Sequence, residues 1–186
     1  MITELTEAPH AEGARLRHLS PVRTDSVLQL TREAEHRNTT DADRAMDSRR
    51  WSAETNGTGL GMPSEGLGPQ DFLDRIPMRD FDAHRHAEVL TARTFERHPT
   101  ITVLSTAHDR RTDWLRAGQA LERILLVATA HGVRASLLHQ GPEWPDLREQ
   151  LAPSADTRPQ HTQMVIRLGD GPEGHASPRS NEPRCG

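Results

Sequence analysis

The chain has 186 residues, of which 33% are hydrophobic, enough to bury one modest core but hardly two. Its formal charge of -4 is small, and the 23 basic residues are scattered among 27 acidic ones, which argues against a concentrated nucleic-acid-binding surface. The only cysteine, Cys185, excludes an internal disulfide and a cysteine-based metal site. The apolar runs are shorter than the ~20 residues that span a bilayer, and the N-terminus is acidic where a signal peptide is apolar. We therefore expect a cytoplasmic protein with no membrane or nucleic-acid partner.

The first half of the chain is expected to contain little stable structure of its own. Residues 1–23 show no hydrophobic periodicity and are predicted to form a disordered tail. Within residues 24–97, the pattern predicts a short amphipathic helix from Thr24 and a second helix that begins near Thr40. A Gly- and Pro-rich loop follows, from residue 56 to residue 82. A loop of this length is either a functional, lid-like segment or a simple linker.

Residues 98–171 are predicted to form the folded core. The run TITVLST at residues 100–106 is rich in β-branched residues and predicts a strand buried on both faces. A second buried strand is predicted at QMVIRLG, and a short helix at PEWPDLREQL with Pro145 in its first turn. This order of elements indicates an α+β or α/β fold. Residues 172–186 are predicted to be a C-terminal tail.

A long helix is predicted between the two strands, with Asp109 or Thr112 as its N-cap. Its apolar positions recur at steps of three and four: Trp114, Leu115, Ala117, Leu121, Ile124, Leu125 and Ala128. Gly118 costs about 0.5–1 kcal/mol relative to alanine inside a helix, so we expect another backbone, helix or flat ligand to approach it closely. Gly132 is expected to end the helix in a left-handed conformation. The segment VRASLLHQ is then expected to fold back along the helix or to enter a sheet edge.

Motifs for metal, hydrolytic and nucleotide chemistry are incomplete. His84 and His86 lie two residues apart, but no cysteine or HExxH pair accompanies them, so solvated histidines are predicted rather than a metal site. Ser105 and Ser136 lack the GxSxG setting of a nucleophile. The glycine-rich GTGLGMPSEGLG is not preceded by a strand, which favours a plain loop over a phosphate-binding one.

One ordered set of motifs resembles a known family. HPTITVLSTAHDRRTDWLRAGQALERILLVATAHGVRASLLHQ, EWPDLREQL, QMVIRLGDGP and SPRS follow one another as in the C-terminal half of the flavin-dependent nitroreductase superfamily. The similarity is greatest to the Acg-like branch of actinobacteria. It extends back through RRW, GMPSEGLGP and PMRDF, so that it covers roughly residues 25–180.

The resemblance implies an α+β fold in which an antiparallel sheet is flanked by helices and FMN lies at the interface between two such units. Most relatives form this interface as homodimers. Acg-like proteins resemble such a dimer fused into one chain, and this sequence is similar to the second half of that chain. Carried over by position, the helix that contains Gly118 would lie at the interface. The flavin ring would be approached by five residues: Ser136, Leu137, Leu138, His139 and Gln140. Arg179 in SPRS would contact the FMN phosphate, for which a guanidinium fork is well suited.

Structural roles remain open for three of these positions: Arg179 as a mobile tail residue, Leu138 as plain core and His139 as plain surface. The sequence also departs from the family pattern. Asp170 stands where the family tends to have an aromatic residue, Ser180 where it tends to have a second basic residue, and the N-terminal phosphate clamp has no counterpart in residues 1–24.

Two functions follow from the resemblance. The first is an FMN-linked oxidoreductase of nitroreductase type, in which NAD(P)H is the electron donor and a nitroaromatic or quinone-like molecule is the acceptor. The flavin carries such chemistry, so few catalytic side chains are expected. The second is a truncated or degenerate half-domain that binds or sequesters flavin without turnover, or that pairs with another protein supplying the N-terminal half.

Overall fold

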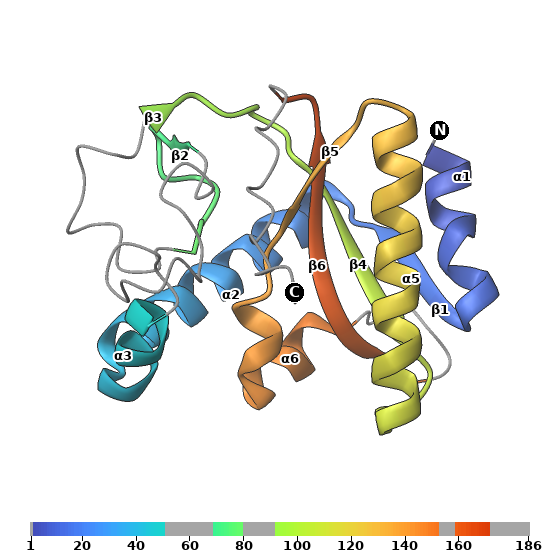
Figure 1. Ribbon diagram of the computed structural model, residues 1–186. Helices are drawn as coiled ribbons and strands as arrows, with labels where there is room; N and C mark the ends of the chain where they lie inside the picture. Colours follow the sequence, from blue (N-terminus) through green and yellow to red (C-terminus); the bar gives the residue numbers. More distant parts are fainter. Residues whose placement is uncertain (1, 51–68, 80–91, 153–158, 172–186) are drawn as a thin grey trace, which may run out of the picture.

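The computed structural model describes residues 2–50, 69–79, 92–152 and 159–171. A four-stranded sheet with the order β1-β4-β6-β5 forms its centre, and each neighbouring pair is antiparallel (Figure 1). The strands are β1 (Ala14–His18), β4 (Thr100–Thr106), β5 (Arg134–Leu137) and β6 (His161–Gly169). The two strands predicted as buried are therefore confirmed, and they pair with each other in the middle of the sheet.

Helices cover both faces of this sheet (Figure 1). They are α1 (Ile2–Glu7), α2 (Pro21–Thr40), α3 (Ala42–Arg50), α5 (Arg111–Ala130) and α6 (Pro145–Leu151), together with the short 3-10 helices η1 (Ala8–Glu12) and η4 (Gly141–Glu143). This arrangement confirms the α+β class with an antiparallel sheet flanked by helices. The two polar helices expected after residue 23 are α2 and α3, and Pro145 begins α6 as predicted.

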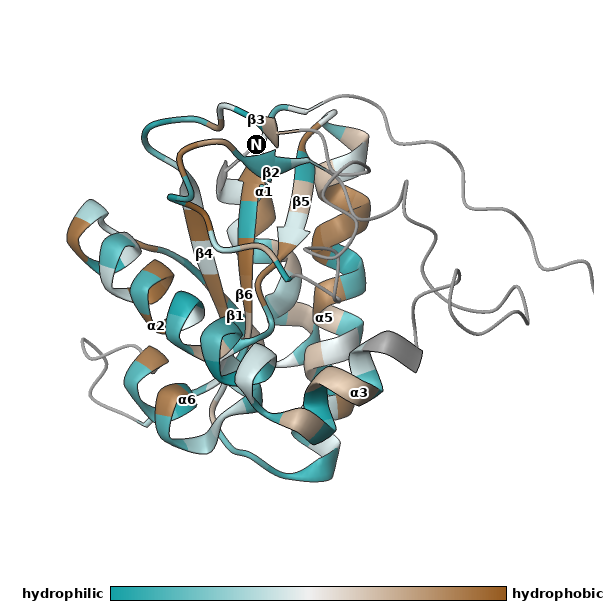
Figure 2. Ribbon diagram, turned by 90° about the vertical axis from the view of Figure 1, so that its left-hand side faces the viewer, coloured by the Kyte–Doolittle hydropathy of each residue, from teal (hydrophilic) through white to brown (hydrophobic). Residues whose placement is uncertain are grey.

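Two hydrophobic clusters form on opposite faces of the sheet because the side chains of β4 and β6 alternate. Leu104 and Ile166 pack with Leu5 of α1 and Ile124 of α5. On the other face, Ile101, Val103 and Val165 pack with residues of α2 and α6: Val27, Leu28 and Leu151. Figure 2 shows the brown, hydrophobic residues gathered on β4, β6 and α5, with teal residues on the outer side of α2. The sheet is therefore the middle layer of three.

Residues 2–19 correct the prediction of a disordered N-terminal tail. They form α1, η1 and β1, and β1 pairs with β4 from Ala14 opposite Thr106 to His18 opposite Thr102. Leu5, Leu16 and Leu19 are buried. Their spacing changes from helical to strand periodicity within a few residues, too few for either period to be recognised in the sequence.

The long helix was predicted correctly in position, and its apolar face was correct except at its N-terminal end. Ala117, Ala120, Ile124 and Ala128 are buried, whereas Leu115 is 68% exposed and Trp114 is 51% exposed. The N-cap is Arg110 rather than Asp109 or Thr112, and its backbone N–H donates to the Asp113 carboxylate at 3.1 Å.

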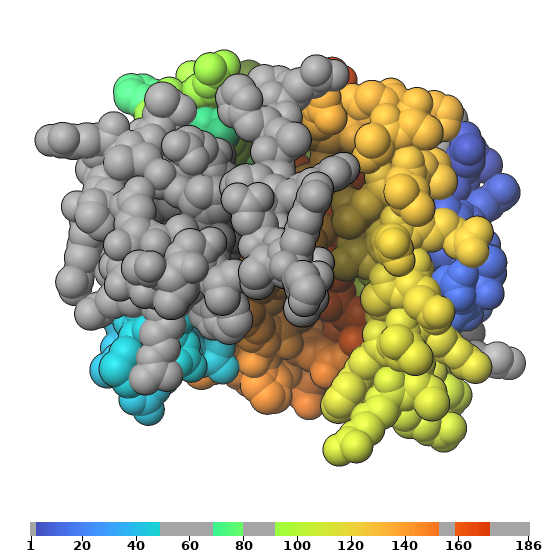
Figure 3. All heavy atoms as spheres, in the orientation of Figure 1, coloured from blue at the N-terminus to red at the C-terminus, as the bar shows by residue number. Residues whose placement is uncertain are grey.

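The two glycines of this region behave differently. Gly132 has φ +70° and ends α5 as predicted, before β5 enters the edge of the sheet. A Cβ on Gly118, by contrast, would meet nothing within 4 Å, so none of the described residues makes the close approach expected there. Figure 3 shows α5, in yellow, at the molecular surface.

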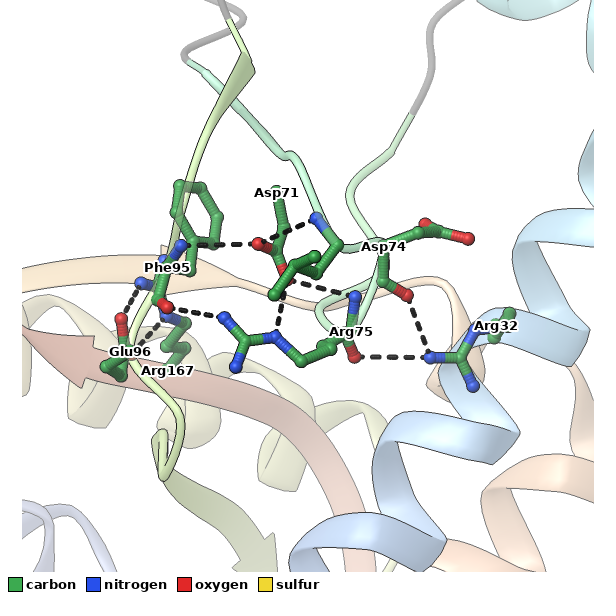
Figure 4. A network of polar contacts seen from close by, with 8 residues as sticks. Arg32, Asp71, Asp74, Arg75, Phe95, Glu96 and Arg167 are labelled. Carbon is green, nitrogen blue, oxygen red and sulfur yellow. Dashed lines mark hydrogen bonds and ion pairs between the residues drawn. The ribbon is translucent and has the colours of Figure 1, made fainter.

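A small parallel pair, β2 (Gln70–Asp71) and β3 (Ala92–Arg93), is fixed to the sheet by a polar network (Figure 4). The buried Asp71 carboxylate accepts hydrogen bonds from the backbone N–H groups of Leu73, Arg75 and Phe95. Burial by itself would raise the pKa of Asp71. The hydrogen bonds to its ionised form outweigh this effect and keep the pKa below its ordinary value. Glu96 binds Arg167 of β6 in a bidentate pair. Much of the predicted loop from 56 to 82 lies outside the described residues.

Candidate functional site

The segment Ser136–Gln140 leaves the end of β5 and leads directly into η4. Leu138 is 1% exposed, and its backbone N–H donates to the carbonyl of Val165 at 2.9 Å. Ser136 is half-buried on β5, while Leu137 is 38% exposed at the edge of the sheet. The segment is thus held by β6 and presents alternate side chains to the core and to the outside. Leu138 packs in the hydrophobic cluster on the α2 face of the sheet.

Gln140 is the most unusual residue of this segment. Its side chain is fully buried, yet neither its amide nitrogen nor its amide oxygen has a hydrogen-bond partner. Leaving one buried polar group unpaired costs about 1–3 kcal/mol. Such a side chain is expected to bind a water molecule or the polar edge of a ligand.

Gly141 explains how the chain can turn so closely against α6. A Cβ at this position would lie 2.8 Å from Cδ1 of Leu151, whose side chain is 1% exposed. Glycine therefore lets η4 pack directly on α6. This close contact fixes the backbone immediately after Gln140.

His139 lies in a charged cluster, which we define as Arg44, Arg79, His139 and Glu143. The Arg79 guanidinium approaches His139 Nε2 at 2.5 Å and donates to Glu143 Oε1 at 2.7 Å. Glu143 Oε1 also lies 3.6 Å from His139 Nε2, and Glu143 Oε2 accepts from Arg44 at 3.2 Å. Burial, followed by the Arg79 charge, lowers the pKa of His139, while Glu143 acts in the opposite direction. His139 is therefore partly buried and hydrogen-bonded rather than a simple surface histidine.

Trp144 joins the charged cluster to α2 and α3. The guanidinium of Arg44 lies 4.3 Å from the centre of the Trp144 ring, and that of Arg37 lies 5.3 Å from it. The indole N–H donates to Asn38 Oδ1 at 3.1 Å. Stacking on cations and a satisfied indole N–H hold this half-buried ring in one orientation.

A separate surface groove of about 950 Å³ lies between α2 and α6. Arg23, Leu30, Arg37 and Leu147 are among the residues that line it. None of Ser136–Gln140 lines this groove, and Arg37 alone connects it to Trp144. The groove is therefore distinct from the candidate site.

Several predicted positions cannot be placed. Arg179, His84 and His86 lie outside the described residues. Within the ranges that the structure does describe, there is no group of three or more His, Cys, Asp or Glu side chains that could hold a metal ion. The same ranges contain no helix long and apolar enough to cross a membrane.

Sequence reasoning missed the partners of His139. Arg79 and Arg44 come from segments 60 and more residues away along the chain, so nothing in the local pattern indicates the contact. Glu143 lies only four residues from His139, and this spacing was the one available signal.

Comparisons with known proteins bear on the fold. No family model and no curated protein matches the chain. Among solved structures, a nitroreductase with bound FMN from Bacteroides fragilis is similar at 13% identity, with a TM-score of 0.50. The match covers 99% of this chain and 83% of that chain. The chain has a nitroreductase-like fold. At 13% sequence identity, the similarity to the nitroreductase concerns the fold alone. The chain spans most of the length of that neighbour.

Proposed function

We propose that the protein is an FMN-linked oxidoreductase of nitroreductase type. In this proposal, FMN is reduced by NAD(P)H and a nitroaromatic or quinone-like molecule accepts the electrons. The nitroreductase-like fold supports the cofactor, since the similar solved structure carries FMN. The observation that carries the proposal is the buried, unpaired amide of Gln140, which lies within the segment expected to approach the flavin.

The residues present fit a flavin. The pyrimidine edge of the isoalloxazine ring offers both hydrogen-bond donors and acceptors, and the Gln140 amide provides one group of each kind. Ser136 and His139 add polar side chains in the same segment, and Leu137 and Leu138 add apolar ones. Arg179 would bind the phosphate. Bound FMN would supply the hydride and electron chemistry, and these residues would bind and orient it.

A homodimer is part of this proposal. Leu115 and Leu126 are 68% and 65% exposed on the outer side of α5, and Gly118 lies between them with open space at its Cβ. The positions are spaced so that they share one helix face, and a glycine there permits the close approach of a second helix. We infer that α5 packs against a second copy, with the flavin at the interface between the two.

A second candidate function is flavin binding without turnover. Arg79 and Arg44 are both ion-paired with Glu143, so the FMN phosphate would depend on Arg179 or on a second polypeptide. An Acg-like partner that supplies a further basic clamp is compatible with this alternative. Such a chain would retain flavin but would not oxidise NAD(P)H.

An absorption experiment separates these possibilities. The purified protein is mixed with excess FMN, desalted, and examined for the visible absorption bands of flavin. Retained flavin followed by NAD(P)H oxidation with a quinone supports the enzyme, and retained flavin without oxidation supports storage. Loss of all flavin would remove both functions.

Two substitutions locate the cofactor in that experiment. We expect Gln140→Leu and Arg179→Ala each to weaken FMN binding by about tenfold, the effect of losing one hydrogen bond to a charged or buried group. Glu149→Gln, on the exposed face of α6, is the matched control. Unchanged affinity in either variant would remove that residue from the site.

A further inference from the structure

Glu143 contacts residues from three parts of the chain. One carboxylate oxygen binds Arg79, at the end of the segment 69–79, and lies near His139, at the end of β5. The other oxygen binds Arg44 of α3. A single half-exposed carboxylate in η4 therefore faces two arginines and one histidine.

The His139 ring contacts Arg79 directly and lies 3.6 Å from this carboxylate. Arg79 can only donate hydrogen bonds, so the short contact at 2.5 Å requires His139 Nε2 to be the unprotonated, accepting nitrogen. A guanidinium and an imidazole would repel each other if the ring became protonated. Glu143 Oε1 lies close to both groups and offsets the Arg79 charge at this position.

We propose that Glu143 is a positioning residue that fixes Arg79 and His139 in one arrangement on the surface where the flavin would bind. This inference rests on the proposed function, because it assigns a role within the same site. Glu143 does not itself touch the ring in this scheme. It holds the neutral imidazole beside an arginine, so that His139 presents a defined tautomer and Arg79 a fixed positive charge.

The contact with α3 extends the proposal to a second element. Arg44 lies over Trp144 and donates to both Glu143 and Asn38. Loss of the carboxylate would therefore loosen α3 as well as Arg79. A purely structural role for Glu143 predicts lower stability alone, whereas a positioning role also predicts a change in the titration of His139.

The first test is the NMR titration of His139 in the flavin-free protein, with its resonance assigned from the spectrum of His139→Gln. Among the described residues, the charged groups that face the ring are Arg79 and Glu143, with Arg44 behind Glu143. In Glu143→Gln the negative charge that favours the protonated ring is lost from this position, so the titration midpoint of His139 should shift downward. Glu143→Asp should restore part of the shift, and Glu149→Gln should leave the midpoint unchanged. An unchanged midpoint in Glu143→Gln overturns the proposal.

The second test is FMN affinity, measured by quenching of FMN fluorescence in the same variants after circular dichroism has established that they are folded. We expect about tenfold weaker binding in Glu143→Gln, the effect of losing a charged hydrogen bond. Equal affinity in wild type and Glu143→Gln overturns the positioning role. If wild type itself binds no FMN, the proposed function fails, while the His139 titration still decides whether Glu143 positions the ring.

Discussion

At the scale of single residues, Asp109 gathers several hydrogen bonds at a point away from the candidate site. Asp109, just before α5, accepts a bidentate pair from Arg148 of α6 at 2.7 and 2.9 Å. Trp114 Nε1 donates to it at 2.6 Å, and Gln163 of β6 donates at 3.3 Å. These hydrogen bonds, the one from Arg148 first, lower the pKa of Asp109 to about 2. One carboxylate therefore joins α5, α6 and β6.

We predict that Asp109→Asn lowers the free energy of unfolding by about 1–2 kcal/mol at pH 7, a value reduced from that of a buried pair because the side chain is partly exposed. Because the pKa of Asp109 is lower in the folded protein, its ionised carboxylate stabilises the fold at any pH above the ordinary carboxyl pKa of 3.8. This stabilisation is lost as the pH falls towards 2 and the carboxylate becomes protonated. Urea unfolding of both proteins at pH 7, 4 and 2.5 measures the difference. A difference that stays constant with pH would contradict the role of the ionised carboxylate.

Gly141 provides a second test at this scale. In Gly141→Ala the new methyl would lie 2.8 Å from Leu151 Cδ1, within a packed core. Moving Leu151 away should cost about 1–3 kcal/mol, as in other overpacked cores. Thermal unfolding measures this cost. Full stability in Gly141→Ala would show that Leu151 changes rotamer freely and that the close contact is not needed.

At the scale of elements, the sequence predicted those with a long or uniform pattern. Every residue of β4 except Ser105 is apolar or β-branched, so a buried strand was recognisable, and α5 maintains helical spacing over 20 residues. The short β1 has only two buried positions, Ala14 and Leu16, and was missed for that reason. Trp114 and Leu115 of α5 were wrongly expected on its buried face because periodicity cannot separate a core-facing apolar residue from one on an outer face. Partners in the charged cluster were unpredictable, since tertiary contacts alone bring Arg79 and Arg44 to Glu143.

The outer face of α5 gives a prediction at the element scale. If Leu115 and Leu126 pack against a second copy, Leu115→Glu with Leu126→Glu should convert a dimer to a monomer, because charges would be buried at the interface. Light scattering after size-exclusion chromatography measures the mass. The matched control is the double variant Arg116→Glu with Glu149→Gln, in which exposed polar side chains are replaced by other polar ones. A wild-type monomer at micromolar concentration would contradict the dimer.

For the whole molecule, the N-terminal residues are part of the domain rather than an appendage. Leu5 and Leu16 belong to the same hydrophobic cluster as Ile124 of α5. Glu4 and Glu12 contact His131 and Arg123 at 2.7 and 2.9 Å, so α1 and η1 are also fastened to α5 by polar contacts. Both faces of the sheet are complete only when this segment is in place.

Removal of residues 1–19 should therefore abolish cooperative folding. The truncation exposes the edge of β4 and part of both hydrophobic clusters, a loss comparable with the roughly 5–15 kcal/mol by which domains are typically stable. Circular dichroism on heating and the fraction of soluble protein after expression report the effect. A sharp unfolding transition in the truncated protein would contradict it.

The pairing of β1 with β4 also constrains how the protein is made. Ala14 and Thr106 are partners in the sheet, although about ninety residues separate them along the chain. At a synthesis rate of roughly 5–20 residues per second, β1 leaves the ribosome several seconds before its partner strand exists. During that interval Leu5, Leu16 and Leu19 have no sheet to cover them. The nascent chain thus exposes a hydrophobic segment that a chaperone can bind, until β4 is synthesised and the sheet closes.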